Sequence, residues 1–244
     1  MIPNQADEPL VPPTVLETLR DGLGILELAR LVAATRHLSS LPRGDGAAVM
    51  LLPGFGTGDA SNALLRGYLR HLGYDARGWG LGRNSGEVPS LIPRVADRVA
   101  AWSDAIGAPV HLVGWSLGGY LGREAARERP DVVAQVIMFG SPVVGGPKYT
   151  AAARYYLRQG VDVDAIEVAA AEREAVALQV PVTAIYSRAD GVVAWRACID
   201  RINAVVQHVE VAATHVGLGF SPEVWEIVVR RLYDRSRELA AAVD

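Results

Sequence analysis

The chain has 244 residues, half of them hydrophobic and 21% charged, a composition typical of one large folded domain rather than of a disordered segment. Its formal net charge of −3 gives no basic surface for nucleic acid, so no nucleic-acid partner is expected. Cys198 is the only cysteine, which excludes an internal disulfide and fits a reducing compartment.

The first residues, 1–46, are expected to form a helical extension packed on the rest of the chain. Their acidic start lacks the basic and apolar regions of a signal peptide, and no apolar run has the length of a membrane span. A cytoplasmic protein without an integral membrane segment is therefore predicted; peripheral membrane contact stays open. Four leucines recur at helical spacing: Leu16, Leu19, Leu23 and Leu26. The favoured interpretation is a helix lying on the core, and the alternative is a membrane-surface or dimer helix.

Short apolar runs and helix-like stretches alternate from residue 47 onward. The apolar runs cover 47–52, 74–79, 109–113, 132–139, 180–186 and 205–212. The helix-like stretches cover 60–72, 91–106, 117–128, 192–203 and 223–242. Continuous apolar strands that alternate with helices are typical of a parallel sheet covered on both faces. The predicted fold class is therefore α/β, a doubly wound, mostly parallel sheet within one domain, 47–244.

Residues 113–119, Val-Gly-Trp-Ser-Leu-Gly-Gly, carry the pattern Gly-x-Ser-x-Gly between a predicted strand and a predicted helix. The pattern alone is weak evidence, but this position is the one that a nucleophile elbow requires. The strained turn presents the serine hydroxyl beyond the sheet, and Gly114 and Gly118 leave room for the neighbouring strand and helix. Ser116 is therefore the predicted nucleophile; the alternative is a plain glycine-rich turn.

One segment, 143–179, interrupts the alternation between two strands. It is rich in alanine and charge and begins with the sequence Val-Val-Gly-Gly-Pro. A short helical insert is predicted, forming a cap over the strand ends. Its apolar residues would make only one narrow face, which either roofs a pocket or closes the core.

A nucleophilic serine needs a base and an orienting acid, and in this arrangement both follow it along the chain. Of the two histidines after Ser116, His208 falls within an apolar run, whereas His215 lies just past that run in a glycine-containing loop. His215 is therefore the predicted base. Asp190 follows the strand 180–186 at the same sheet edge and is the predicted acid. A surface-loop histidine and a turn-forming Asp-Gly are the plain alternatives.

Two backbone N–H groups have to face the oxyanion that forms during acyl transfer. Leu117, the first residue of the helix after Ser116, is the first predicted donor. The second is expected from the loop 52–58, Leu-Pro-Gly-Phe-Gly-Thr-Gly, whose glycines allow close approach, and Phe55 is assigned. A phosphate-binding loop is disfavoured there because no Gly-Lys-Ser/Thr follows.

These motifs together resemble the α/β-hydrolase superfamily and, within it, bacterial lipase/esterase-like proteins. The resemblance covers roughly 49–220 and rests on Gly114–Gly118, on Asp190 and His215 in that order, on Pro53-Gly54-Phe55-Gly56, and on the stretches 78–84 and 186–195. Pro53 stands where many lipases carry histidine, a change that preserves the backbone donor. The resemblance implies ester hydrolysis with no organic cofactor and no metal.

The predicted function is cleavage of a small apolar carboxylic ester, of short to medium acyl chain, through a Ser-His-Asp triad and an acyl-enzyme. Besides Phe55 and Leu117, the predicted pocket walls are apolar: Trp79, Leu81, Trp115, Val192, Leu218 and Phe220. The alternatives are a thioesterase, an amidase or an acyltransferase with the same triad, a true lipase, and a non-catalytic binding protein on the same fold. The oligomeric state stays open.

Overall fold

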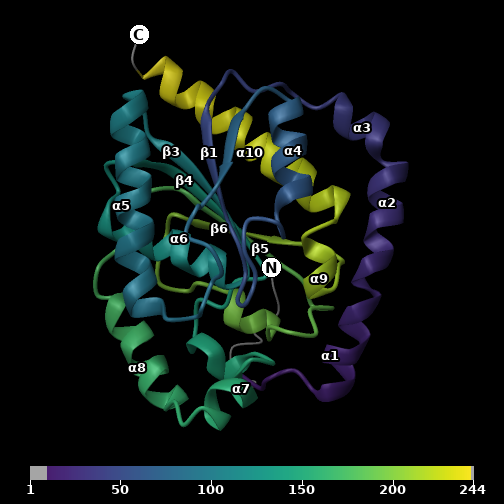
Figure 1. Cartoon of the computed structure of the whole chain (residues 1–244), viewed down its shortest axis with the longest axis vertical. Coiled ribbons are helices and arrows are strands. Elements are labelled where there is room, and N and C mark those ends of the chain that lie inside the picture. The colour runs from purple at the N-terminus through teal and green to yellow at the C-terminus, as the bar shows by residue number, and fades with distance from the viewer. Residues whose placement is uncertain (1–9, 243–244) are drawn as a thin grey trace.

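A computed structural model describes residues 10–242. Its centre is a six-stranded sheet in the order β2-β1-β3-β4-β5-β6 (Figure 1). The strands are β1 (Ala48–Leu52), β2 (Asp75–Gly78), β3 (Val110–Trp115), β4 (Val133–Phe139), β5 (Val182–Tyr186) and β6 (Val206–Glu210). Each neighbouring pair runs parallel. The predicted doubly wound parallel sheet is confirmed, with one strand at each of the six apolar runs; β3 extends two residues beyond its run, to Trp115.

Helices cover both faces of the sheet. On one face lie α5 (Val88–Ile106) and α6 (Leu117–Glu128), and on the other α4 (Ala63–His71) and α10 (Pro222–Ala241). Successive side chains of a strand point to opposite faces, so Met50 packs into the α5–α6 layer while Leu51 packs into the α4–α10 layer. Burial on both faces explains why the inner strands are mostly apolar, whereas the edge strands β2 and β6 are partly exposed and carry charged residues.

The predicted helix at 192–203 is wrong. Only one short 3₁₀ turn, η3 (Trp195–Cys198), forms there. The Asp200 carboxylate accepts the N–H groups of Ile202 and Asn203, each at 2.9 Å. Because this side chain bonds to nearby backbone, it favours a turn over a continued helix.

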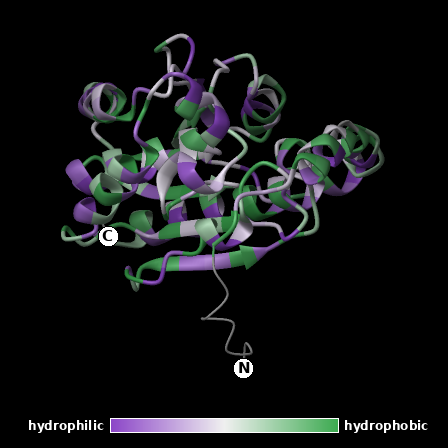
Figure 2. Ribbon diagram, turned by 90° about the horizontal axis from the view of Figure 1, so that it is seen from below, coloured by the Kyte–Doolittle hydropathy of each residue, from purple (hydrophilic) through white to green (hydrophobic). Residues whose placement is uncertain are grey.

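The N-terminal extension is a broken helical segment along one side of the molecule (Figure 1). It consists of α1 (Val15–Asp21), η1 (Gly22–Leu26), α2 (Glu27–Ala33) and α3 (Thr35–Ser39). Thr14 and Glu17 form a capping box at the start of α1. The four leucines at helical spacing do not face the core: their side chains are exposed, from 58% at Leu16 to 72% at Leu19. These helices stand beside the sheet with mixed hydrophobic and hydrophilic surfaces (Figure 2).

The segment 143–179 holds three short helices: η2 (Gly146–Tyr149), α7 (Ala153–Arg158) and α8 (Val163–Arg173). Asp162 caps α8 by accepting the N–H groups of Asp164 and Ala165. The four-residue helix α9 (His215–Leu218) follows β6 and lies next to α1 and η1 (Figure 1). Within residues 10–242, none of the helices combines the length and apolar character needed to cross a bilayer.

Candidate active site

Ser116 occupies the sharp turn between β3 and α6. Its backbone has φ 54° and ψ −125°, and it is the one non-glycine residue among those described with a positive φ. Such a conformation costs about 1–3 kcal/mol and persists only where the surrounding structure enforces it. The strain is an observed property of the position at which the sequence predicts a nucleophile.

Close packing explains the glycines on either side of this serine. A Cβ atom on Gly118 would lie 2.3 Å from the Leu52 carbonyl oxygen at the end of β1. A Cβ on Gly114 would lie 2.4 Å from the Gly119 Cα atom of α6. Any larger residue would therefore push the nucleophile turn away from the sheet.

The glycine-rich loop after β1 lies directly beside Ser116. A Cβ on Gly54 would sit 3.5 Å from the Ser116 Cβ atom. The N–H groups of Phe55 and Leu117, both on residues that line the cavity beside Ser116, meet no acceptor within residues 10–242. Asn84 holds the loop in place, because its fully buried side chain donates to the Pro53 carbonyl at 2.9 Å.

Asp190 and His215 meet at the same edge of the sheet. Asp190 lies in the loop after β5, and His215 begins α9 after β6. His215 Nδ1 is 2.7 Å from Asp190 Oδ2, and both side chains are buried. Asp190 Oδ1 accepts the N–H groups of Val192 and Val193 at 2.9 and 2.7 Å. These bonds fix the carboxylate so that its second oxygen faces the imidazole.

The environment of His215 favours its protonated form. Burial alone would lower the pKa of His215, but the charge of Asp190, its hydrogen bond and the charge of Asp21 outweigh burial and raise the pKa above 6.5. A carboxylate at Nδ1 keeps a proton on that nitrogen and leaves Nε2 as the nitrogen that can accept another.

The other candidate reactive groups are occupied or inert. His208 lies in β6, as predicted, and its Nε2 accepts the Asp200 N–H at 2.9 Å. Burial lowers the pKa of His111 to about 4. Burial also raises the pKa of the Cys198 thiol well above its usual value. Within residues 10–242, no three His, Cys, Asp or Glu side chains gather in a way that would hold a metal ion.

A cavity of about 560 Å³ opens beside Ser116 and His215. Four of the predicted wall residues line it: Phe55, Trp115, Leu117 and Val192. Most of the remaining lining is also apolar and comes from α5 and from the cap: Val88, Pro89, Ile92, Pro147, Ala152, Tyr156, Ile166, Ala169 and Ala170. A cavity of this size and character fits a small apolar ligand.

The other four predicted wall residues lie elsewhere. Trp79 is fully buried in the α5–α6 core, where its Nε1 donates to the Gly82 carbonyl, and Leu81 packs against the same core. Leu218 is fully buried in the opposite core, and Phe220 packs edge-on against Trp115, away from the cavity lining. These assignments are corrected because the residue type, apolar and bulky, is common to core and pocket.

The cap covers the cavity from the side opposite the sheet. Phe55 contacts Tyr155 and Tyr156 of α7, with ring centroids 5.5 and 5.7 Å apart. The Tyr156 hydroxyl donates to the Gly86 carbonyl at 3.3 Å. The cap therefore closes directly over the loop after β1.

No protein-family model matches the chain, and no curated protein matches it in sequence. Solved structures do match. A monoacylglycerol lipase from Paleococcus ferrophilus is 16% identical, with a TM-score of 0.57 over 80% of this chain and 97% of that one. Mouse alpha/beta hydrolase domain-containing protein 10 is 17% identical, with a TM-score of 0.56 over 81% and 92%. A putative aryl esterase from Burkholderia cenocepacia is 18% identical, with a TM-score of 0.53 over 82% and 93%. The chain has the α/β-hydrolase fold.

Within this α/β-hydrolase fold, a buried cluster of charges joins α6 to the cap. Arg123 of α6 is 1% exposed and contacts Glu124, Glu174 and Asp200 at 2.5, 2.8 and 2.5 Å. Arg173, which lines the cavity from the end of α8, reaches Glu124 at 2.6 Å. The cluster connects the end of α8 to α6, the helix that begins directly after Ser116.

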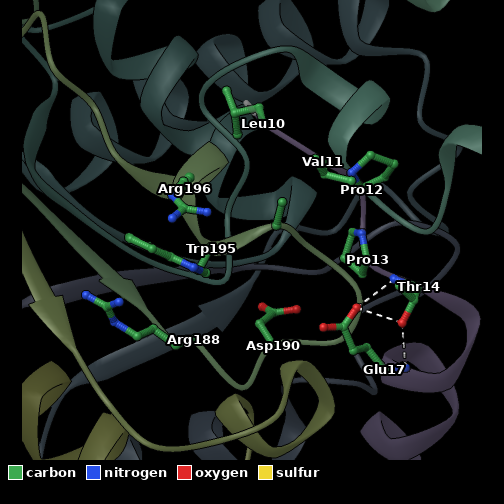
Figure 3. Close-up of a pocket in the computed structure, with 11 residues that line it drawn as sticks. Leu10, Val11, Pro12, Pro13, Thr14, Glu17, Arg188, Asp190, Trp195 and Arg196 are labelled. Carbon is green, nitrogen blue, oxygen red and sulfur yellow. Dashed lines mark hydrogen bonds between the residues drawn. The ribbon is translucent and has the colours of Figure 1, made fainter. Parts of the chain in front are cut away.

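A second hollow, of about 450 Å³, separates the start of the extension from the loop after β5 (Figure 3). On its wall Trp195 lies between Arg188 and Arg196, whose guanidinium carbons are 4.4 and 4.8 Å from the indole centroid. The Asp190 carboxylate also faces this hollow (Figure 3). Beyond the hollow, the extension contacts the same loop directly, because Gly191 bonds both Thr18 and Asp21.

Sequence reasoning missed three residues that shape this site: Asp21, Asn84 and Arg123. Asn84 carries the one local signal, since it stands within a glycine-rich stretch where a side chain can replace missing backbone partners. Asp21 and Arg123 carry none, because a charged residue on a helix normally faces solvent.

Proposed function

We propose that the chain is a serine hydrolase that cleaves carboxylic esters of short to medium acyl chain. The observation that carries the proposal is the contact of 2.7 Å between His215 Nδ1 and Asp190 Oδ2, at a cavity that the strained Ser116 also lines. A strained serine, a buried acid–base pair and an adjacent apolar cavity are the parts that acyl transfer needs.

The mechanism follows from the roles of these residues. His215 Nε2 takes the Ser116 proton as the hydroxyl oxygen attacks the acyl carbonyl, and the Phe55 and Leu117 N–H groups stabilise the oxyanion. His215 then protonates the leaving alcohol, which departs from the acyl-enzyme. Water, deprotonated by the same imidazole, releases the acid and restores the serine. Asp190 holds the imidazole tautomer and stabilises the imidazolium. The Ser116 hydroxyl makes no hydrogen bond within residues 10–242, and the hydrogen bonds of a catalytic hydroxyl often tighten only when substrate binds.

The cap argues for a soluble substrate. Its aromatic residues lie on the loop after β1, and the buried charges around Arg123 hold its far end to α6. Opening this cap would separate charges that are out of water, which is costly. A substrate that enters a closed cavity as a single molecule fits better than a triglyceride drawn from an oil surface.

Esters should be hydrolysed best at short to medium acyl length, with no jump in rate at the solubility limit. The measurement is a chain-length series of p-nitrophenyl esters and matched thioesters, followed across that limit beside long-chain triglyceride emulsions. A sharp rise at the limit, with triglyceride as the better substrate, would make the protein a true lipase. Faster cleavage of every thioester than of its matched ester would make it a thioesterase.

The pH dependence should report His215. A general base acts only when neutral, so kcat/KM should rise with pH as His215 loses its proton. Because Asp190 and Asp21 raise the pKa of His215, the half-maximal point should lie above 6.5. The check is kcat/KM for a soluble ester from about pH 5 to 9. A rate that does not change over this range would contradict a histidine base.

A further inference from the structure

Asp21, in the N-terminal extension, directs its carboxylate at both catalytic loops. Its side chain is buried, and the residue is 2% exposed. Oδ1 accepts the N–H groups of Gly191 at 3.1 Å and of His215 at 2.6 Å. Oδ2 accepts the N–H of Val216 at 2.8 Å. One carboxylate thus bonds the residue after Asp190, the residue His215 itself and the residue after it.

Further contacts hold the extension close to the same two loops. The Thr18 hydroxyl donates to the Gly191 carbonyl at 2.8 Å, and the Thr214 hydroxyl donates to the Asp21 carbonyl at 3.3 Å. A Cβ on Gly191 would lie 2.2 Å from the Glu17 carbonyl oxygen, and a Cβ on Gly24 would lie 2.4 Å from Thr214 Oγ1. At these points the extension and the two loops are in direct contact.

We propose that Asp21 is a positioning residue, which sets the separation and orientation of Asp190 and His215 by bonding the backbone of both loops. The inference rests on the proposed function, since it concerns the geometry of the same acid–base pair. The two loops follow different strands, β5 and β6. Besides the Asp190–His215 contact, the Ser187 side chain also joins them, because its hydroxyl accepts the N–H groups of Ala189 and Ala213 at 3.1 and 3.3 Å. Asp21 supplies shorter, charge-assisted bonds, which are stronger.

The negative charge of Asp21 has a second effect. The charged groups that face the His215 ring are Asp190 and Asp21, and each raises the pKa of His215. Trp115 and Gly140, which also pack against the ring, carry no charge. Loss of the Asp21 charge should therefore lower the pKa of His215 and move the acid limb of kcat/KM to lower pH.

Two substitutions separate the bonds from the charge. Asp21→Asn keeps one oxygen, so the bonds to Gly191 and His215 remain possible while the charge is lost. Asp21→Ala removes both. We expect Asp21→Ala to lower kcat about 10- to 100-fold with little change in KM, because misplaced catalytic groups slow the chemical step. Asp21→Asn should lower kcat less than Asp21→Ala does. In both variants, however, the acid limb of the pH profile of kcat/KM should move to lower pH by the same amount.

The matched control is Thr14→Ala, which removes the capping box of the same helix without touching either loop. It should weaken α1 but leave kcat and the pH profile unchanged. If both Asp21 variants keep the wild-type kcat and acid limb, or if Thr14→Ala loses as much kcat as Asp21→Ala, the positioning role is wrong.

The titration of the His215 ring, followed by NMR, gives a readout that needs no turnover. Failure of the wild-type protein to react with a fluorophosphonate would instead overturn the proposed function, whatever the Asp21 variants do.

Discussion

Ser116→Ala should reduce ester turnover by about 10⁴- to 10⁶-fold and abolish covalent labelling by a fluorophosphonate. Alanine has no oxygen to attack the acyl carbonyl, so no acyl-enzyme can form. His215→Ala should lose a similar factor, because serine and base act as one unit and the loss of either stops the attack. The measurements are kcat/KM for a soluble ester and labelling of the purified protein.

The fold should survive the serine substitution. Ser116 makes no side-chain hydrogen bond within residues 10–242, and alanine keeps the Cβ atom at the same positive φ. The thermal unfolding midpoint should therefore stay at the wild-type value. His208→Ala is the matched control for the base, since His208 bonds Asp200 rather than the acid. An inactive His208→Ala beside a fully active His215→Ala would reverse the assignment of the base.

The sheet and the strained turn at Ser116 were predictable because they follow local rules. A strand buried on both faces tends to be continuously apolar, as 48–52 is, so the pattern identifies it without knowledge of its neighbours. The turn between β3 and α6 likewise has a local sequence pattern, with glycines on either side of the strained Ser116. Gly118 has to be small, because a Cβ atom there would lie 2.3 Å from the end of β1. Asp190 and His215 follow from chain order and from the rule that parallel strands end at one edge.

The cavity walls were not predictable in the same way. Trp79 and Trp115 both flank strand ends, yet the first is fully buried in the core and the second lines the cavity. What separates them is the place of each strand in the sheet, since β2 lies at its edge and β3 near its centre, beside the cap. Strand order depends on contacts between distant segments, which periodicity does not encode.

Long-range polar contacts were equally hidden. Asp21 and His215 are 194 residues apart in the chain, and Arg123 and Asp200 are 77 apart. Nothing near Asp21 in the sequence distinguishes it from the exposed acids of an ordinary surface helix. The four leucines at helical spacing predicted that their side of the helix faces the core, because apolar residues usually do. The structure places these leucines in solvent and the aspartate inside.

Arg123→Met should lower the free energy of unfolding by about 3–5 kcal/mol, because methionine keeps much of the volume but takes one cation out of a buried cluster and removes from Asp200 the cation that it contacts. Glu124, Glu174 and Asp200 all contact the Arg123 guanidinium, and the side chains of Glu124 and Asp200 are no more than 2% exposed. The loss of stability comes from leaving a buried carboxylate without a counter-charge, and not from losing a strong attraction between two ions. Urea denaturation of both proteins is the measurement.

The control is Arg129→Met, which breaks an ion pair with Asp131 at 2.8 Å on the surface of the same region. Both partners there are well exposed, so water replaces the lost contact and the change should stay within about 1 kcal/mol. Equal losses in the two variants would mean that the buried cluster is no more sensitive to a missing cation than an exposed pair is.

The loss of stability in Arg123→Met should also depend on pH, and the protonation of the buried carboxyls determines the direction of this dependence. Burial raises the pKa of Glu174 and of Asp200, but hydrogen bonds, those from Arg123 among them, outweigh it and leave both lowered. A carboxyl whose folded pKa is lowered stabilises the fold above its unfolded pKa, and that contribution is lost as pH falls through the folded pKa. Without Arg123 the two carboxyls bind protons more readily in the folded protein. Lowering the pH therefore removes unfavourable buried charge from the variant, whereas in the wild type it removes a favourable interaction and lowers the free energy of unfolding. The stability difference should therefore be largest near neutral pH and shrink toward pH values of about 3 to 4. A difference that stays constant over this range would show that the loss comes from packing and not from the uncompensated carboxylates.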